Sequence, residues 1–140
     1  MTSAVLNRVR APLHPLHAML LAFPLALFVG ALLSDLAYWR TYHIQWANFA
    51  AWLNAGGLLV GAFAVLWALV GLLRTRRRGR TALYFILLLA MWVLGFVNAL
   101  VHGRDAWAAM PAGLWLSAIV AMLAVAAAWI GYSGASEEGR

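Results

Sequence analysis

The sequence has no cysteine and no lysine, and only 10% of its 140 residues are charged. Without cysteine, the chain can form no disulfide, hold no iron–sulfur cluster and offer no thiol nucleophile. It also has no glycine-rich phosphate loop and no His-Glu-x-x-His motif, and its two glutamates, Glu137 and Glu138, lie in the last segment of the printed sequence. We therefore find no signature of an enzyme, and the sequence predicts neither catalytic residues nor a metal site.

Hydrophobic residues are abundant instead, at 66% of the chain, whereas soluble domains have just under half. They form four long runs, and a membrane-spanning helix needs about 20 residues. Backbone amides in hydrocarbon must pair within their own segment, and these runs do not alternate as barrel strands do, so each run predicts a helix. We expect an all-α integral membrane protein, a bundle of four transmembrane helices in one domain over residues 1–140, with helices near 16–39, 49–73, 81–102 and 112–132.

Arginine is the only abundant charged residue, and the net charge is +6. The loop at residues 74–80 carries five arginines, while the neighbouring loops carry one each, Arg40 and Arg104. Because the more positive loops stay cytoplasmic, this asymmetry places the 74–80 loop, the N-terminus and the C-terminal tail in the cytoplasm. The five arginines of the 74–80 loop could also bind anionic lipid headgroups. No aromatic side chains accompany them as a stacking platform for nucleic acid. The arginines of this loop are Arg74, Arg76, Arg77, Arg78 and Arg80.

Small residues recur at every fourth position of the first expected helix. Such a stripe lets two helices approach closely, which is the main means of packing where no hydrophobic effect operates between helices. The second helix carries Gly57-x-x-x-Gly61. We expect these residues to pack the helices within one chain; the alternative is an interface with a second copy or a partner. The recurring positions in the first helix are Ala18, Ala22, Ala26, Gly30 and Ser34.

Polar side chains within the apolar runs are the candidates for function, because polar groups in hydrocarbon are costly unless they are paired. On the expected topology, all four helices bring one to the same depth, near their outer ends. Asn98, His102 and Asp105 fall at i, i+4 and i+7, one face of a helix that continues this far. Gly95 and Met91 extend this face, which we expect to point into the bundle. The candidate cluster comprises Asp35, Asn54, Asn98, His102, Asp105 and Ser117.

This cluster has two interpretations. In the first, the polar groups pair with each other as a structural clasp, and Asp35 binds His102 or Arg104; this is the interpretation that we favour. In the second, they line a pocket that opens to the outer side, where Asp35 and His102 exchange protons or bind a ligand. An ionisable residue inside a membrane is by default a candidate for function, so the second interpretation stays open.

Haem b is a candidate cofactor, because a four-helix membrane bundle is a typical architecture of a b-type cytochrome. His17 is expected at the inner face and His102 at the outer face, about 30 Å apart, which is the thickness of the hydrocarbon core. Both cannot ligate one iron, so no cofactor is expected, and haem b or a quinone is kept as the alternative.

The first expected helix also carries a motif. The stretch His17-Ala-Met-Leu-Leu-Ala-Phe23-Pro24, followed later by Ser34-Asp35, resembles the first helix of the bacterial domain of unknown function family 2231. The resemblance implies a small polytopic protein of the bacterial inner membrane without an assigned activity. Some relatives are joined to, or encoded with, Rieske-type redox proteins, which by association implies an anchor or accessory for electron transfer. The positions that match the family are His17, Phe23, Pro24 and Asp35.

Later segments, at residues 92–107 and 110–113, are similar to one branch of the same family, so that the resemblance covers residues 12–134. The chain departs from the family at some positions. Ala18 stands where many relatives have proline, and Tyr84 stands where many have a histidine. A Gly-Gly and His segment after the last helix is absent. If those histidines hold a cofactor in relatives, we expect this chain to have lost that role.

The expected function is therefore non-enzymatic, that of a structural or accessory subunit. Its partners are the lipid bilayer and either further copies of the chain or another membrane protein, and no nucleic acid is expected. One alternative is a redox-associated subunit that binds quinol or haem near the periplasmic face, at Asp35, Asn98 and His102. A second alternative is a small transporter component.

Overall fold

The computed structural model describes residues 14–76, 78–104 and 106–134, and within these ranges the chain forms five helices and no strand. Four of the helices are long and apolar enough to cross a membrane, and α4 is one short turn. The predicted all-α bundle of four spanning helices is therefore confirmed. The helices are α1 Pro15–Thr41, α2 Ile44–Arg74, α3 Arg78–His102, α4 Ala106–Ala109 and α5 Ala112–Gly134.

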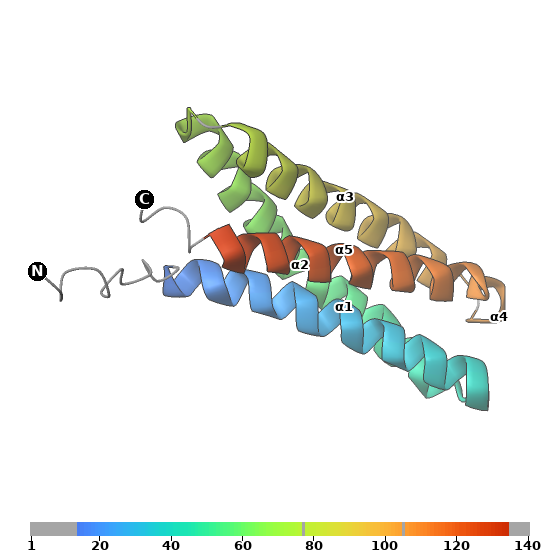
Figure 1. Ribbon diagram of the computed structural model, residues 1–140. Helices are drawn as coiled ribbons and strands as arrows, with labels where there is room; N and C mark the ends of the chain where they lie inside the picture. Colours follow the sequence, from blue (N-terminus) through green and yellow to red (C-terminus); the bar gives the residue numbers. More distant parts are fainter. Residues whose placement is uncertain (1–13, 77, 105, 135–140) are drawn as a thin grey trace, which may run out of the picture.

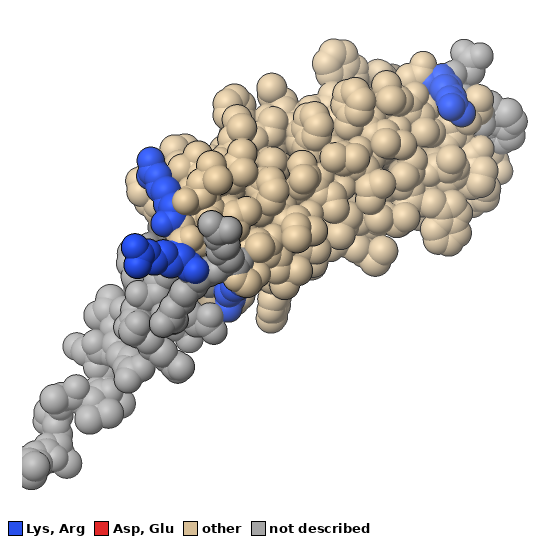
Figure 2. Space-filling view, turned by 90° about the horizontal axis from the view of Figure 1, so that it is seen from above, with Lys and Arg blue, Asp and Glu red and all other residues tan. Residues whose placement is uncertain are grey.

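The four long helices run antiparallel to their chain neighbours and close into a ring, in which α1 and α3 each pack against both α2 and α5 (Figure 1). The start of α1, the connection between α2 and α3 and the end of α5 share one end of the bundle. We call it the basic end, because Arg74, Arg76 and Arg80 lie there. The turn between α1 and α2 lies with α4 at the far end. On the face drawn in Figure 2, basic side chains gather near the two ends, and the surface between them is uncharged.

Local sequence explains where α1 and α2 begin and end. His14 precedes Pro15, and the residue before a proline avoids helical dihedrals, so α1 begins at Pro15. It ends where Tyr42 adopts the left-handed conformation at φ 55°. The second helix was expected near residue 49 and the third near 81, but they begin at Ile44 and Arg78. The earlier start of α2 is possible because residues 44–48 contain neither proline nor glycine, so the polar side chains of Gln45 and Asn48 do not interrupt the helix.

The buried residues of the long helices recur at alternating intervals of three and four. This spacing averages about 3.5 residues, the period at which helices pack along a left-handed seam. Each long helix therefore turns one row of residues towards the bundle axis. The rows are Leu21, Pro24, Phe28, Ala31, Asp35 and Tyr38 in α1; Ala50, Asn54, Gly57, Gly61, Ala64 and Ala68 in α2; Tyr84, Leu88, Met91, Gly95 and Asn98 in α3; and Gly113, Ser117, Val120, Ala124 and Ala127 in α5.

The packing stripe expected in the first helix is wrong at two positions, because Ala22 and Ala26 are exposed. Gly30 is half-buried and Ser34 is buried. The buried row of α1 is instead the one that contains Asp35. A carboxylate is costly on a lipid-facing surface, so the helix turns it inwards, and the residues one and two turns away on the same face become buried with it.

Large side chains of α1 fit against small residues of α2. Gly57 and Gly61 of α2 are both buried, as the sequence predicted. The ring of Phe28, itself 1% exposed, lies so close to Gly57 that a Cβ on this glycine would stand 2.8 Å from it. A Cβ on Gly95 of α3 would stand 3.3 Å from the same ring. The close approach of α1, α2 and α3 at this level therefore depends on two missing side chains.

Gly57→Ala should lower the free energy of unfolding by about 1–3 kcal/mol, the usual cost of adding atoms to a packed core. The control is Gly71→Ala, because a Cβ at Gly71 meets no heavy atom within 4 Å and alanine is the better helix former. Reversible unfolding in mixed micelles measures both variants. Equal stabilities would show that Phe28 does not fill the space beside Gly57.

Candidate functional site

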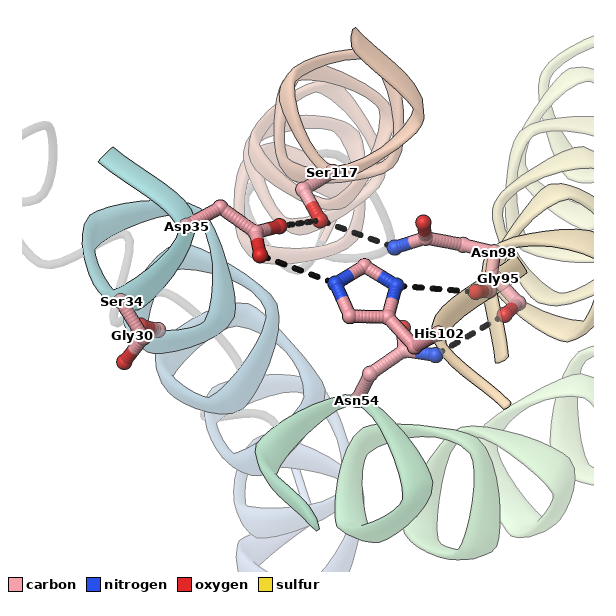
Figure 3. A network of polar contacts seen from close by, with 8 residues as sticks. All are labelled: Gly30, Ser34, Asp35, Asn54, Gly95, Asn98, His102 and Ser117. Atoms are coloured by element: carbon pink, nitrogen blue, oxygen red, sulfur yellow. Dashed lines mark hydrogen bonds and ion pairs between the residues drawn. The ribbon is translucent and has the colours of Figure 1, made fainter. Parts of the chain in front are cut away.

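Five polar side chains meet inside the far end of the bundle, and each of the four long helices contributes at least one (Figure 3). They are deeply buried: Asp35, Asn54 and Asn98 are 0% exposed, and Ser117 is 2% exposed. We call this set the polar clasp. It consists of Asp35 from α1, Asn54 from α2, Asn98 and His102 from α3, and Ser117 from α5.

Four members of the clasp form a closed ring of hydrogen bonds. Nε2 of His102 lies 2.9 Å from Oδ1 of Asp35. The Ser117 hydroxyl donates to Oδ2 of the same carboxyl group at 2.5 Å and accepts from Nδ2 of Asn98 at 2.8 Å. The ring closes where Nδ1 of His102 meets the backbone carbonyl of Asn98 at 3.0 Å. Three helices, α1, α3 and α5, are thereby joined at one depth.

The ring leaves one proton to be shared between His102 and Asp35. A backbone carbonyl only accepts hydrogen bonds, so Nδ1 of His102 carries a hydrogen where it faces Asn98. Nε2 faces a carboxyl oxygen, so a second proton lies between these two atoms, on the imidazole or on the carboxyl group. In both cases the pair has no net charge, which lowers the cost of burying it.

Asn54 brings α2 into the clasp through the backbone of α3. Its Nδ2 donates to the carbonyl oxygen of Gly95 at 3.0 Å. The two amide oxygens, Oδ1 of Asn54 and Oδ1 of Asn98, are buried and accept no hydrogen bond from any described residue. The clasp therefore keeps two unused acceptors, and both are sealed from the surface.

Helix spacing and one glycine position the imidazole. Asn98 and His102 are one helical turn apart, so the side chain of His102 folds back over the carbonyl of Asn98. On the facing helix, a Cβ on Gly113 would stand 2.9 Å from Cε1 of His102. The ring therefore lies against the bare backbone of α5. Gly113 was not among the residues of the predicted cluster, although it lies four residues before Ser117, on the same helix face.

Five of the six candidate polar residues meet in the clasp, and the sixth, Asp105, lies outside the described residues. Asp35 binds His102; Arg104, the other partner that the sequence left open, is exposed. Ser117 donates to the carboxyl group and not to the imidazole. The arrangement therefore differs from a Ser-His-Asp triad, in which the serine hydroxyl donates to the histidine.

A cavity of about 420 Å³ opens at the far end, between the start of α2 and the end of α3. Its polar lining residues are Gln45, Asn48, His102 and Arg104. The side chain of His102 is only 3% exposed, and that of its partner Asp35 is 0% exposed. The clasp therefore meets the cavity through one imidazole, and the carboxyl group is sealed behind it.

A second polar contact, which the sequence analysis did not predict, lies at the basic end. Nε2 of His17 is 2.9 Å from the hydroxyl of Tyr84, and the ring of His17 stacks on Trp67 with 5.5 Å between centroids. The family resemblance carried a signal for this pair, because it singled out His17 as a motif position and Tyr84 as a departure from the motif. Along α3, Tyr84 and His102 are about 27 Å apart at 1.5 Å per residue. His17 and His102 therefore lie too far apart to ligate one iron.

The described residues contain no group of three or more His, Asp or Glu side chains that could hold a metal ion. A family model described as "Predicted membrane protein (DUF2231)" matches residues 13–139 of the chain. The matched range contains the motif of α1, in which Pro24 is buried and Phe23 is 55% exposed, and all five residues of the clasp. The resemblance seen in the sequence is thus confirmed. No curated protein and no solved structure matches the chain.

Replacing both Asp35 and His102 should cost less free energy of unfolding than the sum of the two single replacements. Asp35→Leu or His102→Leu leaves the other group buried without its partner, and each should lower the free energy of unfolding by about 3 kcal/mol. The double variant replaces the pair with apolar side chains and should lose clearly less than the sum of the two single losses. Unfolding by steric trapping in bicelles gives the three values.

Thr41→Ala is the control for this cycle, because the Thr41 hydroxyl is exposed and, among the described residues, bonds to nearby backbone alone, the Ala37 carbonyl and the His43 amide. Its stability should stay within about 0.5 kcal/mol of the wild type. Additive losses in the two clasp variants would contradict a coupled pair.

Proposed function

This chain belongs to the DUF2231 family of predicted membrane proteins, and we propose that it serves as a non-enzymatic accessory subunit that packs against other proteins in the membrane. One observation carries the proposal: the polar side chains that a reaction would use bind each other inside the bundle. A general acid or base has to reach its substrate, whereas Asp35 is 0% exposed and fully engaged. The clasp is suited to holding helices in register, and the outward surface is suited to contacts.

The apolar middle of the bundle argues against a small transporter component. Between the clasp and the His17–Tyr84 contact, the core is built from apolar side chains such as Phe28, Leu88 and Val120. A polar solute or ion needs polar groups along its way through the hydrocarbon. Between the two ends, the indole N–H of Trp92 is already bound to the Leu58 carbonyl, and the buried core residues at this level are apolar.

The exposed side of α1 is the surface that we assign to a partner helix. Ala22 and Ala26 lie one turn apart, and both are exposed. Small side chains let a second helix approach closely, and close packing is what drives association where lipid is as apolar as the helices. The interface alternative for the small-residue stripe thus accounts for the two positions that the bundle itself does not use.

We place the protein in a bacterial inner membrane, with the basic end in the cytoplasm. Support comes from the arginines of segment 74–80, because positively charged connections are retained on the cytoplasmic side. The described chain also begins and ends at the basic end. In this orientation the clasp and the cavity beside it face the periplasmic side.

Ala26→Leu should therefore release the chain from its partner without unfolding it. The matched control is Ala55→Leu, because Ala55 is likewise an exposed alanine, but on α2. The tagged full chain is solubilised from its native host in mild detergent, and its complexes are separated on a native gel. We expect the wild type and Ala55→Leu to migrate as one complex of fixed stoichiometry, and Ala26→Leu to migrate as the free chain.

Equal helical circular dichroism of the three purified proteins checks that the substitutions leave the fold intact. A wild-type chain that migrates alone, without a partner or a second copy, would overturn the accessory role. Equal behaviour of Ala26→Leu and Ala55→Leu would remove α1 as the interface.

One observation favours a second candidate function, the binding of quinol or haem beside the clasp. The cavity at the far end reaches His102, and an imidazole can bind a quinol oxygen or ligate a haem iron. As a redox-associated subunit, the chain would bind its ligand near the periplasmic face. Nε2 of His102 would exchange Oδ1 of Asp35 for the ligand, while the carbonyl of Asn98 still holds Nδ1 and orients the ring.

An absorption spectrum separates these candidates. The accessory role predicts a flat visible spectrum for the protein purified in mild detergent, both oxidised and reduced with dithionite, and no stoichiometric quinone in an organic extract. A bound haem would give a Soret band and sharp bands on reduction. His102→Leu would remove those bands, and His14→Leu, a control at the basic end, would keep them.

A further inference from the structure

An apolar groove runs along the outside of the bundle between α1 and α2, at the basic end. In Figure 1 the two helices diverge towards this end, and the groove between them has a volume of about 660 Å³. It is a different cavity from the one beside the clasp. Its lining includes Leu16 and Leu20 of α1, and Phe63, Trp67, Gly71 and Arg74 of α2.

The groove has the length of one membrane leaflet. From Phe63 to Arg74, α2 rises about 16 Å at 1.5 Å per residue. Half of a hydrocarbon core about 30 Å thick measures about 15 Å. With Arg74 at the level of the lipid headgroups, Phe63 lies near the middle of the membrane. The groove is therefore long enough for one acyl chain that enters from the basic end.

Arg74 is placed for an anionic headgroup. Its side chain is exposed and makes no hydrogen bond or ion pair with another described residue. Arg76 and Arg80 lie at the same end, and Arg80 donates to the Ser133 hydroxyl at 2.8 Å. Asp35, the one carboxyl side chain among the described residues, is buried at the far end. The guanidinium of Arg74 thus stands in a positive surrounding and matches the geometry of a phosphate.

Gly71 keeps the groove open one turn before Arg74. A Cβ built on Gly71 would meet no heavy atom within 4 Å, whereas at Gly57 the ring of Phe28 fills that space. Gly57 is thus explained by packing within the chain, and Gly71 is not. One turn before Arg74, the wall of the groove is therefore bare backbone with room for an acyl chain.

We propose that this groove binds one anionic phospholipid, with its phosphate at Arg74 and one acyl chain against Gly71, Trp67 and Phe63. Charge complementarity selects the anionic headgroup, and the apolar walls select a molecule that carries a chain. The site is separate from the clasp, and it does not depend on the accessory role.

Native mass spectrometry of the full chain tests this site. The protein is released from mixed micelles that contain equal amounts of phosphatidylglycerol and phosphatidylcholine with identical acyl chains. We expect one retained lipid per chain, with phosphatidylglycerol favoured about fivefold, the equivalent of the roughly 1 kcal/mol that a basic residue contributes near an anionic surface. No preference between the two lipids in the wild type would overturn the proposal.

Two variants, each with a matched control, distinguish recognition of the headgroup from binding of the acyl chain in the groove. Arg74→Gln should abolish the preference for phosphatidylglycerol while a lipid is still retained, and Arg76→Gln should leave the preference unchanged. Gly71→Leu should abolish retention of both lipids. Gly79→Leu should retain the lipid as the wild type does, because Gly79 is an equally open glycine at the same end that does not line the groove.

The preference is a ratio, so it does not depend on how much of a variant folds. Equal effects of Arg74→Gln and Arg76→Gln would mean general surface attraction and would overturn the assigned phosphate site. Equal losses in Gly71→Leu and Gly79→Leu would overturn the groove. Displacement of the adduct by excess glycerol phosphate would assign the site to free phosphates, and a dimer peak that only Gly71→Leu removes would assign it to a second copy; either would overturn the phospholipid.

Discussion

The burial of one carboxyl group determines how the far end of this bundle is built. Asp35 lies in an otherwise apolar helix, and a carboxyl group against lipid is costly, so α1 turns this residue into the bundle, where it is 0% exposed. Its two oxygens then need partners, which come from His102 and Ser117 on two other helices. Asn98 closes the ring. The rotation and the relative depth of α1, α3 and α5 all follow from these bonds.

Away from the clasp, shape complementarity takes over from hydrogen bonding. Helices in a membrane gain little from burying apolar surface, because lipid is equally apolar, so they depend on close fit. Phe28 provides it by occupying the space that Gly57 and Gly95 leave free. The apolar middle separates two ends with different properties. The far end holds sealed polar groups beside a cavity, and the basic end has an open groove with an exposed arginine.

Much of the candidate site was predictable because helix periodicity and depth are properties of single helices. Asn98 and His102 share a face at i and i+4, and Asp35 and Ser117 fall at the same level on the expected topology. The choice of partner was not predictable, since Asp35 could reach either His102 or Arg104 from its depth. The role of Gly113 was not predictable for the same reason, because this glycine makes room for the His102 side chain of another helix.

The sequence by itself determined that this chain has four spanning helices, which polar residues share one depth and which end is basic. These follow from local rules, the pairing of backbone amides in hydrocarbon and the placement of charges at the ends of apolar runs. Only the tertiary structure decided which face of each helix turns inwards. The spacing of Ala22 and Ala26 predicted packing positions, yet both residues are exposed. The rotation of α1 is set by the hydrogen bonds of Asp35 to side chains of other helices. The same holds for the groove at Arg74, which exists only because α1 and α2 diverge.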